Sequence, residues 1–296
     1  MNFLGILLEP PPEFVFEIAA DGIAMSRTRT PAGLSNVPQH VALQPGVLTP
    51  SPLKENIVDP LAFAEAVRQL TPAGSGRGKR RAVLVLPANS VRIAVLDFDS
   101  LPDKEDERRQ LISFRLRKSV PFDVDEAALS YFRQAGNKVV VAVAPAGIIE
   151  HYERPFRAAG WLPGLVTVSS LAMLDLLPVT GSIVLAHLSA GVLTVIAMSA
   201  GVVTIVRSVE VGEEGETAAD PIEEVVAAVY PTLAYIEDQT QSRPEKLFIA
   251  GFDKDSVIRL AVELEIPVEP IHDRYPGLAG YLASVAPKPA QKKAAA

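Results

Sequence analysis

The chain contains no cysteine, and aromatic residues make up only 6 % of its 296 residues. Without cysteine it can form no disulfide, no thiolate zinc site and no covalent intermediate on a cysteine nucleophile. Its four histidines are far apart in the sequence and form no HxH or HxxxH pair, so no metal site is predicted. Hydrophobic residues amount to 48 %, and the predicted core is therefore large and aliphatic.

The chain also lacks an excess of positive charge. Its net charge is −7, and the basic residues are dispersed outside 77–81 and 108–118, which argues against a nucleic-acid partner. The start MNFLGILLEPPPEF has no basic region and soon reaches Glu9 and three prolines, so we expect neither a signal peptide nor an anchor there. Neither a GxxxxGK[ST] phosphate loop nor a GxSxG nucleophile motif occurs, and no catalytic residue is assigned.

An uncharged run of about 26 residues extends from Gly181 to Val206 and is long enough to span a bilayer. It contains Ser-Ala-Gly twice, at 189–191 and at 199–201, and the apolar stretches are short and rich in Val, Ile and Thr. This pattern is typical of strands joined by turns. The run also lacks the charged or aromatic flanks that anchor a span at the interface. We predict three buried strands and no direct membrane span. A segment that spans the membrane at 181–206 remains the alternative.

The two halves of the chain are predicted to begin alike. Strands at 14–18 and 23–29 flank Asp21-Gly22, and Asp-Gly supplies the positive φ of a tight hairpin turn. The run at 181–206 opens the second half in the same way. Asp-Pro pairs at 59–60 and 220–221 each indicate a helix start, with Asp as the cap and Pro in the first turn. The expected organisation is an N-terminal arm at 1–13, a first half at 14–180, a second half at 181–284 and a disordered tail at 285–296.

Four segments carry a family resemblance: LVLPANSVRIAVLDFDSLP (84–102), ISFRLRKSVPFDVDEAALSYF (112–132), RPFRAAGWLPGLVTVSSLAML (154–174) and YPTLAYIEDQTQSRPEKLFIAGF (230–252). They resemble the actin-like ATPase superfamily, and within it the PilM family of type IV pilus assembly proteins, which is related to the cell-division protein FtsA. The resemblance covers most of the chain, from about residue 14 to about residue 282. It implies an α/β, actin-like (ribonuclease H-like) duplicated fold, with a small α+β subdomain inserted in the first half at about 82–132.

The resemblance also implies a site for ATP and Mg²⁺ at the first turn of each half and at an adenosine-side turn. ATPases of this superfamily have Asp-x-Gly at both first turns, where the carboxylate orders Mg²⁺ and the glycine lets backbone N–H groups approach the phosphates. The positions of this degenerate site are Glu17, Ala19, Asp21, Gly22, His187, Ser189, Gly191 and Gly251. Because the aspartate and glycine are replaced, we expect no bound cofactor and little or no ATP hydrolysis. An active actin-like ATPase that binds ATP and Mg²⁺ is the alternative.

A PilM-like chain is implied to be a cytoplasmic adaptor that is held at the inner membrane by its partners. The implied partner is a PilN-like bitopic protein, whose N-terminal cytoplasmic segment binds in a groove between the first domain and the inserted subdomain; other pilus assembly proteins are further partners. The candidate groove residues are Phe98, Leu101, Val120, Pro121 and Phe122. The alternative is that these five side chains form the core of the inserted subdomain.

Overall fold

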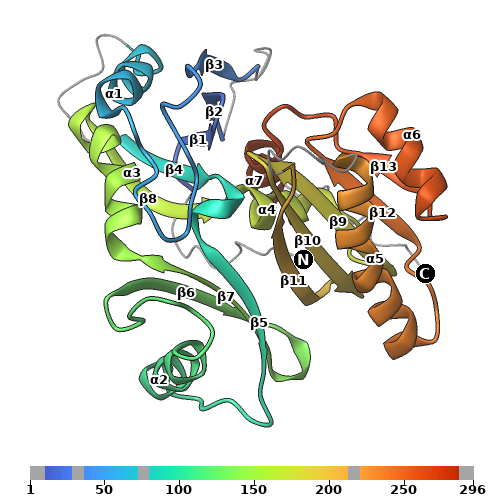
Figure 1. Cartoon of the computed structure of the whole chain (residues 1–296). Helices are drawn as coiled ribbons and strands as arrows, with labels where there is room; N and C mark the ends of the chain where they lie inside the picture. Colours follow the sequence, from blue (N-terminus) through green and yellow to red (C-terminus); the bar gives the residue numbers. More distant parts are fainter. Residues whose placement is uncertain (1–10, 29–36, 73–79, 213–220, 287–296) are drawn as a thin grey trace, which may run out of the picture.

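The computed structural model describes residues 11–28, 37–72, 80–212 and 221–286. The predicted N-terminal arm lies outside the described residues up to residue 10, as do the tail beyond 286 and the expected Asp220 cap. The described chain forms two α/β halves and a smaller subdomain attached to the first half (Figure 1).

Each half contains one five-stranded sheet. The elements of the first half are β1 (Phe14–Ala19), β2 (Gly22–Arg27), β3 (Gln39–Ala42), α1 (Pro60–Gln69), β4 (Arg80–Leu86), α3 (Ala146–Ala158) and β8 (Trp161–Val168). Those of the second half are β9 (Ser182–Ser189), β10 (Val192–Ser199), β11 (Val202–Glu210), α5 (Pro221–Thr240), β12 (Lys246–Ala250), α6 (Lys254–Glu263) and β13 (Val268–Pro270). The strand orders are β3-β2-β1-β4-β8 and β11-β10-β9-β12-β13. Both sheets begin with an antiparallel three-strand meander and continue with two parallel strands, which confirms the predicted duplication.

Tight turns explain why the uncharged run folds as strands. Ser189 pairs with Val192 and Ser199 pairs with Val202, so each turn has two central residues. The alanine and the glycine of both turns have positive φ, as a type I′ hairpin requires. The run is therefore the antiparallel sheet β9-β10-β11, as predicted. Within the described residues, no helix has the length and apolarity needed to cross a membrane.

Helix α7 (Pro276–Val285) follows the last strand of the second half but packs on the first sheet (Figure 1). It covers the face formed by Val15, Ala24, Val83 and Val85, opposite α1 and α3. The predicted second half at 181–284 therefore includes a helix that completes the first half. The sequence pattern had not indicated α7.

Two glycines let α7 approach the short helix α4 (Ser169–Ala172) closely. A Cβ atom built on Gly277 would lie 2.7 Å from the Ser169 Cα, and one on Gly280 would lie 2.2 Å from the Ala172 carbonyl oxygen. Real Cβ atoms do not come this close to backbone atoms, so only glycine fits at these two positions. The close crossing buries Tyr281 completely.

The inserted subdomain begins after β4 with the 3₁₀ turn η1 (Ala88–Ser90). Its further elements are β5 (Arg92–Asp97), α2 (Glu105–Leu116), β6 (Ala127–Arg133) and β7 (Lys138–Pro145). The sheet order is β5-β7-β6. The insertion thus lies later than the predicted 82–132, because 82–86 belongs to the first sheet and β7 is the central inserted strand.

The inserted sheet uses both faces. Ile112 and Leu116 of α2 pack on one face against Val139 and Val141. On the other face Val140 joins a cluster that contains Ile183, Leu185 and Met198 of the second half, with Phe132 packed against it. The subdomain is therefore continuous in sequence with the first half and also makes an apolar contact with the second half.

A polar contact accompanies this apolar one. The Gln134 amide nitrogen donates to the Val203 carbonyl at 2.9 Å, and its oxygen accepts from the Val203 N–H at 2.7 Å. Gln134 is buried, so both of its hydrogen-bonding groups need these partners. One side chain thereby joins the inserted subdomain to β11.

The close helix crossing predicts the effect of adding one methyl group. We expect Gly280→Ala to lower the free energy of unfolding by about 1–3 kcal/mol, because the new Cβ must push α7 away from Ala172. Gly147→Ala in α3 is the matched control, since no heavy atom lies within 4 Å of its built Cβ and alanine favours a helix. Urea unfolding measures both, and equal stability of the two variants would contradict the packing argument.

Candidate functional site

The predicted nucleotide positions form two groups at corresponding strand ends. Glu17 lies near the end of β1, and its hairpin turn contains Asp21. His187 lies near the end of β9, where it pairs in register with Ala250 of β12, next to Gly251. The duplication thus places Glu17 and His187 at equivalent positions of the two sheets.

The Glu17 carboxyl is buried and contacts the start of α7. Glu17 is 3 % exposed. Its Oε1 accepts from the Gly277 N–H at 3.2 Å, and its Oε2 accepts from the Leu278 N–H at 2.7 Å. The first N–H groups of a helix have no partner within the helix, so this carboxyl satisfies two of them. Glu17 is therefore a long-range cap for a helix that begins 259 residues later.

Burial controls the charge of Glu17. It raises the pKa of this carboxyl to about 8, although the two N–H donors of α7 oppose the change. The nearby charges of Asp273 and Asp21 raise the pKa further. At pH 7 the group is therefore mostly protonated and neutral.

The segment before α7 closes over the first hairpin turn. Arg274 forms an exposed ion pair with Asp21, with 3.0 Å between Nη2 and Oδ2. A Cβ built on Gly22 would lie 2.9 Å from the Tyr275 hydroxyl and 2.8 Å from the Val41 carbonyl oxygen. Ala19, which stands where the family has glycine, is half-buried and packs against the cluster under α7. The C-terminal segment therefore covers the turn that would hold phosphate.

His187 is neutral and buried in the second sheet. It is 5 % exposed, and burial lowers its pKa to about 4. Its Nδ1 atom has no hydrogen-bond partner among the described residues. A neutral imidazole at this position supplies none of the negative charge that an aspartate would place beside Mg²⁺.

The remaining second-half positions form tight backbone turns. Ser189 ends β9, and Gly191 has the positive φ of the hairpin turn. The backbone at Gly251 passes so close to β9 that a built Cβ would lie 2.0 Å from the Leu188 carbonyl oxygen. These glycines are explained by backbone geometry alone.

The residues do not fit a Mg²⁺–nucleotide complex. Mg²⁺ binds through charged oxygen ligands and water, whereas Glu17 is mostly neutral and His187 replaces the second carboxylate. Ala19 and Ser189 add side chains where backbone N–H groups would need to approach phosphates. In the described part of the chain, no three His, Asp or Glu side chains are grouped as metal ligands.

The structure places the five predicted groove residues on the inserted subdomain. Phe98, Leu101, Val120 and Phe122 are half-buried and pack against the core of that subdomain. Pro121 is exposed. The alternative interpretation, that they belong to the subdomain core, therefore accounts for four of the five.

Sequence reasoning missed a free strand edge in the same subdomain. Strand β6 pairs with β7 and, within the described residues, with no other strand. The Gln134 N–H donates to the Lys138 carbonyl, and the Ala146 N–H donates to the Glu126 carbonyl. The even-numbered residues of β6 therefore bond to β7. By alternation, the N–H and C=O groups of Leu129, Tyr131 and Arg133 point away from β7. Side-chain patterns do not reveal such an edge, because it is made by the backbone.

A loop of the first half packs on α3, the helix that also contacts β6. Residues 49–57 are held by a buried network in which the Tyr152 hydroxyl donates to Asn56 Oδ1 at 2.9 Å and contacts Ser90 Oγ at 2.9 Å. Leu53 and Val58 of this region are exposed. The loop contacts α3, and α3 also contacts β6, so the loop and the edge flank the same helix.

Comparisons with known proteins agree on the fold. No family model matches the sequence, and no curated protein matches it. A chain of a PilM-PilN type IV pilus biogenesis complex superposes with a TM-score of 0.67 at 17 % identity, over 94 % of this chain and 100 % of that one. The chain has the actin-like fold.

Two further solved structures support this assignment. A Bacteroides thetaiotaomicron protein with an actin-like ATPase fold and unknown function gives a TM-score of 0.54 at 12 % identity, over 91 % of this chain and 94 % of that one. The cytoplasmic domain of EpsL, an inner-membrane component of the Vibrio cholerae type II secretion system, gives 0.53 at 8 % identity, over 92 % and 93 %. The predicted fold class is confirmed.

The raised pKa of Glu17 predicts how stability depends on pH. Between about pH 5 and 8 the folded protein keeps a proton that the unfolded chain has lost, so Glu17 lowers stability as pH rises through this window. Glu17→Gln cannot titrate there. The unfolding free energy of the wild type minus that of the variant should therefore decrease from pH 5 to pH 8 in urea titrations. A constant or increasing difference would show that the carboxyl is charged in the folded protein.

Proposed function

We propose that the protein is a PilM-like adaptor without ATPase activity, which assembles with a PilN-like bitopic protein on the cytoplasmic side of the inner membrane. The machine it serves is a type IV pilus or a related secretion system. The single observation that carries the loss of activity is the buried Glu17 carboxyl, which holds α7 through two backbone N–H groups.

The choice of an adaptor rests on the fold neighbours. One is a complex of PilM with PilN, and another is the cytoplasmic domain of an inner-membrane secretion component. Both superpose on more than nine-tenths of this chain, inserted subdomain included. These neighbours favour a role in assembly over a metabolic reaction.

The free edge of β6 is the proposed binding position for the PilN-like segment. An extended peptide can add to such an edge through backbone hydrogen bonds, while apolar pockets read its side chains. Exposed Leu53 and Val58 of the first half provide apolar contacts on the same side as α3. The groove would then lie between the first domain and the inserted subdomain, with β6 as one wall.

The absence of nucleotide chemistry is tested by titration calorimetry with ATP and Mg²⁺. We expect no dissociation constant tighter than millimolar for the wild-type protein, because the Glu17 carboxyl is mostly neutral, Asp21 is paired with Arg274, and His187 supplies no negative charge to the metal. His187→Asp with Ser189→Gly restores the second turn, so any binding should appear in this variant first. Micromolar binding by the wild type would overturn the proposal in favour of an active ATPase.

Capture of the partner is tested separately at the β6 edge. The probe is a labelled peptide with the N-terminal cytoplasmic sequence of the PilN-like protein encoded by the same organism, and binding is followed by fluorescence anisotropy. Arg133→Pro removes one outward N–H and should weaken binding about tenfold, since one backbone hydrogen bond contributes roughly 1 kcal/mol and the ring also obstructs the incoming strand. Arg133→Ala keeps the N–H and is the control. Equal affinity of the two variants would place the peptide elsewhere.

A further inference from the structure

The helices α5 and α6 carry four large apolar side chains that are exposed on the second half. Tyr230 and Tyr235 of α5 are 59 % and 50 % exposed, and Ile258 and Val262 of α6 are 65 % and 70 % exposed. Soluble proteins expose single apolar residues everywhere, but a group of large ones on two adjacent helices marks an interaction surface. Of these four, Tyr230 lines two cavities, and we call Tyr230 and these two cavities the α5–α6 surface.

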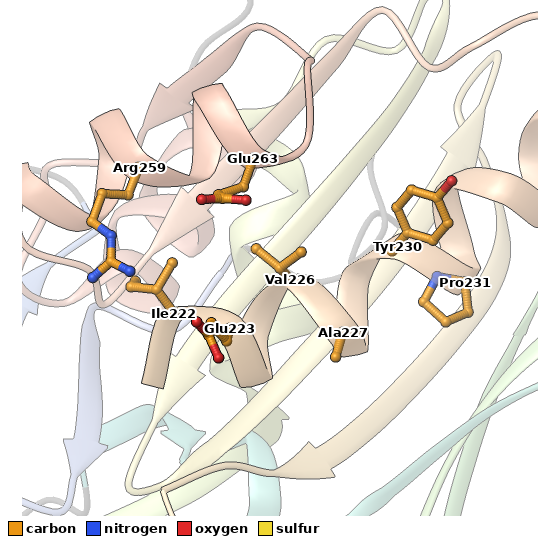
Figure 2. Close-up of a pocket in the computed structure, with 8 residues that line it drawn as sticks. All are labelled: Ile222, Glu223, Val226, Ala227, Tyr230, Pro231, Arg259 and Glu263. Atoms are coloured by element: carbon orange, nitrogen blue, oxygen red, sulfur yellow. The ribbon is translucent and has the colours of Figure 1, made fainter. Parts of the chain in front are cut away.

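Two cavities lie along α5, one on each side of Tyr230. The first, of about 280 Å³, lies between α5 and α6 and is lined by Ile222, Val226 and Glu263 among others (Figure 2). The second, of about 250 Å³, contains Leu233, Leu264 and Ile266. Tyr230 lines both, so they form one interrupted groove from residue 222 to residue 237 of α5. At 1.5 Å per residue this groove is about 22 Å long, the length of a helix of about four turns.

The region of the chain that forms the groove is acidic. Residues 221–271 contain ten acidic and four basic side chains, a net charge of −6 compared with −7 for the whole chain. Figure 2 shows the Glu263 carboxylate and the Arg259 guanidinium extending from α6 toward α5, and the Glu223 carboxylate lying beside α5. Neither glutamate forms an ion pair with another described residue. Arg259 lines the same cavity, so the two glutamates and this arginine together leave one net negative charge for a partner.

A backbone acceptor adds to this negative character. Pro231 lies inside α5 and has no N–H, so the carbonyl of Ala227 cannot receive the usual helical hydrogen bond from the residue four positions later. Both residues line the first cavity. The first cavity is thus lined by two carboxylates and by a helix position whose carbonyl oxygen lacks its helical donor.

We propose that the α5–α6 surface binds a short amphipathic helix of a partner protein, with aliphatic side chains in the two cavities and lysine or arginine side chains facing the glutamates. The walls are helices, which have no strand edge to offer, so an extended peptide is disfavoured. The charge of this region disfavours an anionic lipid surface. This site is distant from the β6 edge in the fold and gives the adaptor a second partner (Figure 1).

A second copy of the chain is the competing occupant. Phe114 of α2 is exposed, and the exposed basic residues Arg109, Arg117 and Lys118 lie on the same helix or at its end. A contact between α2 of one copy and the α5–α6 surface of the next would join unlike surfaces and continue as an open chain. The mass of the protein in solution distinguishes the two occupants, because only binding of a second copy would make the chain oligomerise.

The experiment uses the full chain and a 15-residue peptide of leucine and lysine patterned as an amphipathic helix. Its counterpart has glutamate in place of every lysine. We expect micromolar binding of the basic peptide by fluorescence anisotropy and no binding of the acidic one. Glu223→Lys with Glu263→Lys should weaken binding of the basic peptide at least tenfold, and Tyr230→Glu should weaken it similarly by obstructing both cavities.

The matched control is Asp99→Lys with Glu126→Lys, which makes the same change in net charge on exposed residues of the inserted subdomain. It should bind the basic peptide as the wild type does. An equal loss of binding would show attraction by net charge alone and overturn the proposal.

Equal binding of the basic and the acidic peptide would also overturn the proposal, as would a wild-type oligomer that Tyr230→Glu dissociates in light scattering. Ala227→Lys, at an exposed position that lines the first cavity, should weaken binding too and replaces any variant whose circular dichroism shows misfolding. Unchanged affinity in that variant would refute the site.

Discussion

The capping of α7 by Glu17 is the interaction on which the two-half architecture depends. α7 is the last described helix, and it covers one face of the first sheet, so its position joins the end of the chain to its beginning. The buried N–H groups of Gly277 and Leu278 would be costly without an acceptor, and the carboxyl supplies one to each. A residue at a position that serves a metal in related ATPases is here part of the structural framework.

Two contacts hold the halves together. α7 carries the second half back onto the first sheet, while the inserted subdomain packs Val140 against the second-half cluster. A movement of one half relative to the other would have to disturb both apolar contacts. A rigid body with separate binding surfaces suits an adaptor.

Local features of this fold could be predicted from the sequence because neighbouring residues determine them. Asp21-Gly22 and the two Ser-Ala-Gly turns specify hairpins through their positive φ, and Asp59 caps α1 as expected. α7 could not be predicted in this way: its segment PGLAGYLASV has no polar face, and its glycines fit a surface formed about 100 residues earlier. The role of Glu17 was equally hidden, since its partners are backbone N–H groups rather than a recognisable side chain.

The pairing of Gln134 with Val203 has a consequence for solubility. β11 is the outer strand of its sheet, and an unpaired strand edge is a template on which other chains can aggregate. The Gln134 amide occupies both the N–H and the C=O of Val203, as a neighbouring strand would. β5 lies alongside the same strand and leaves little room for a further one. The inserted subdomain therefore protects an edge that the duplicated halves would otherwise leave open to fibril formation.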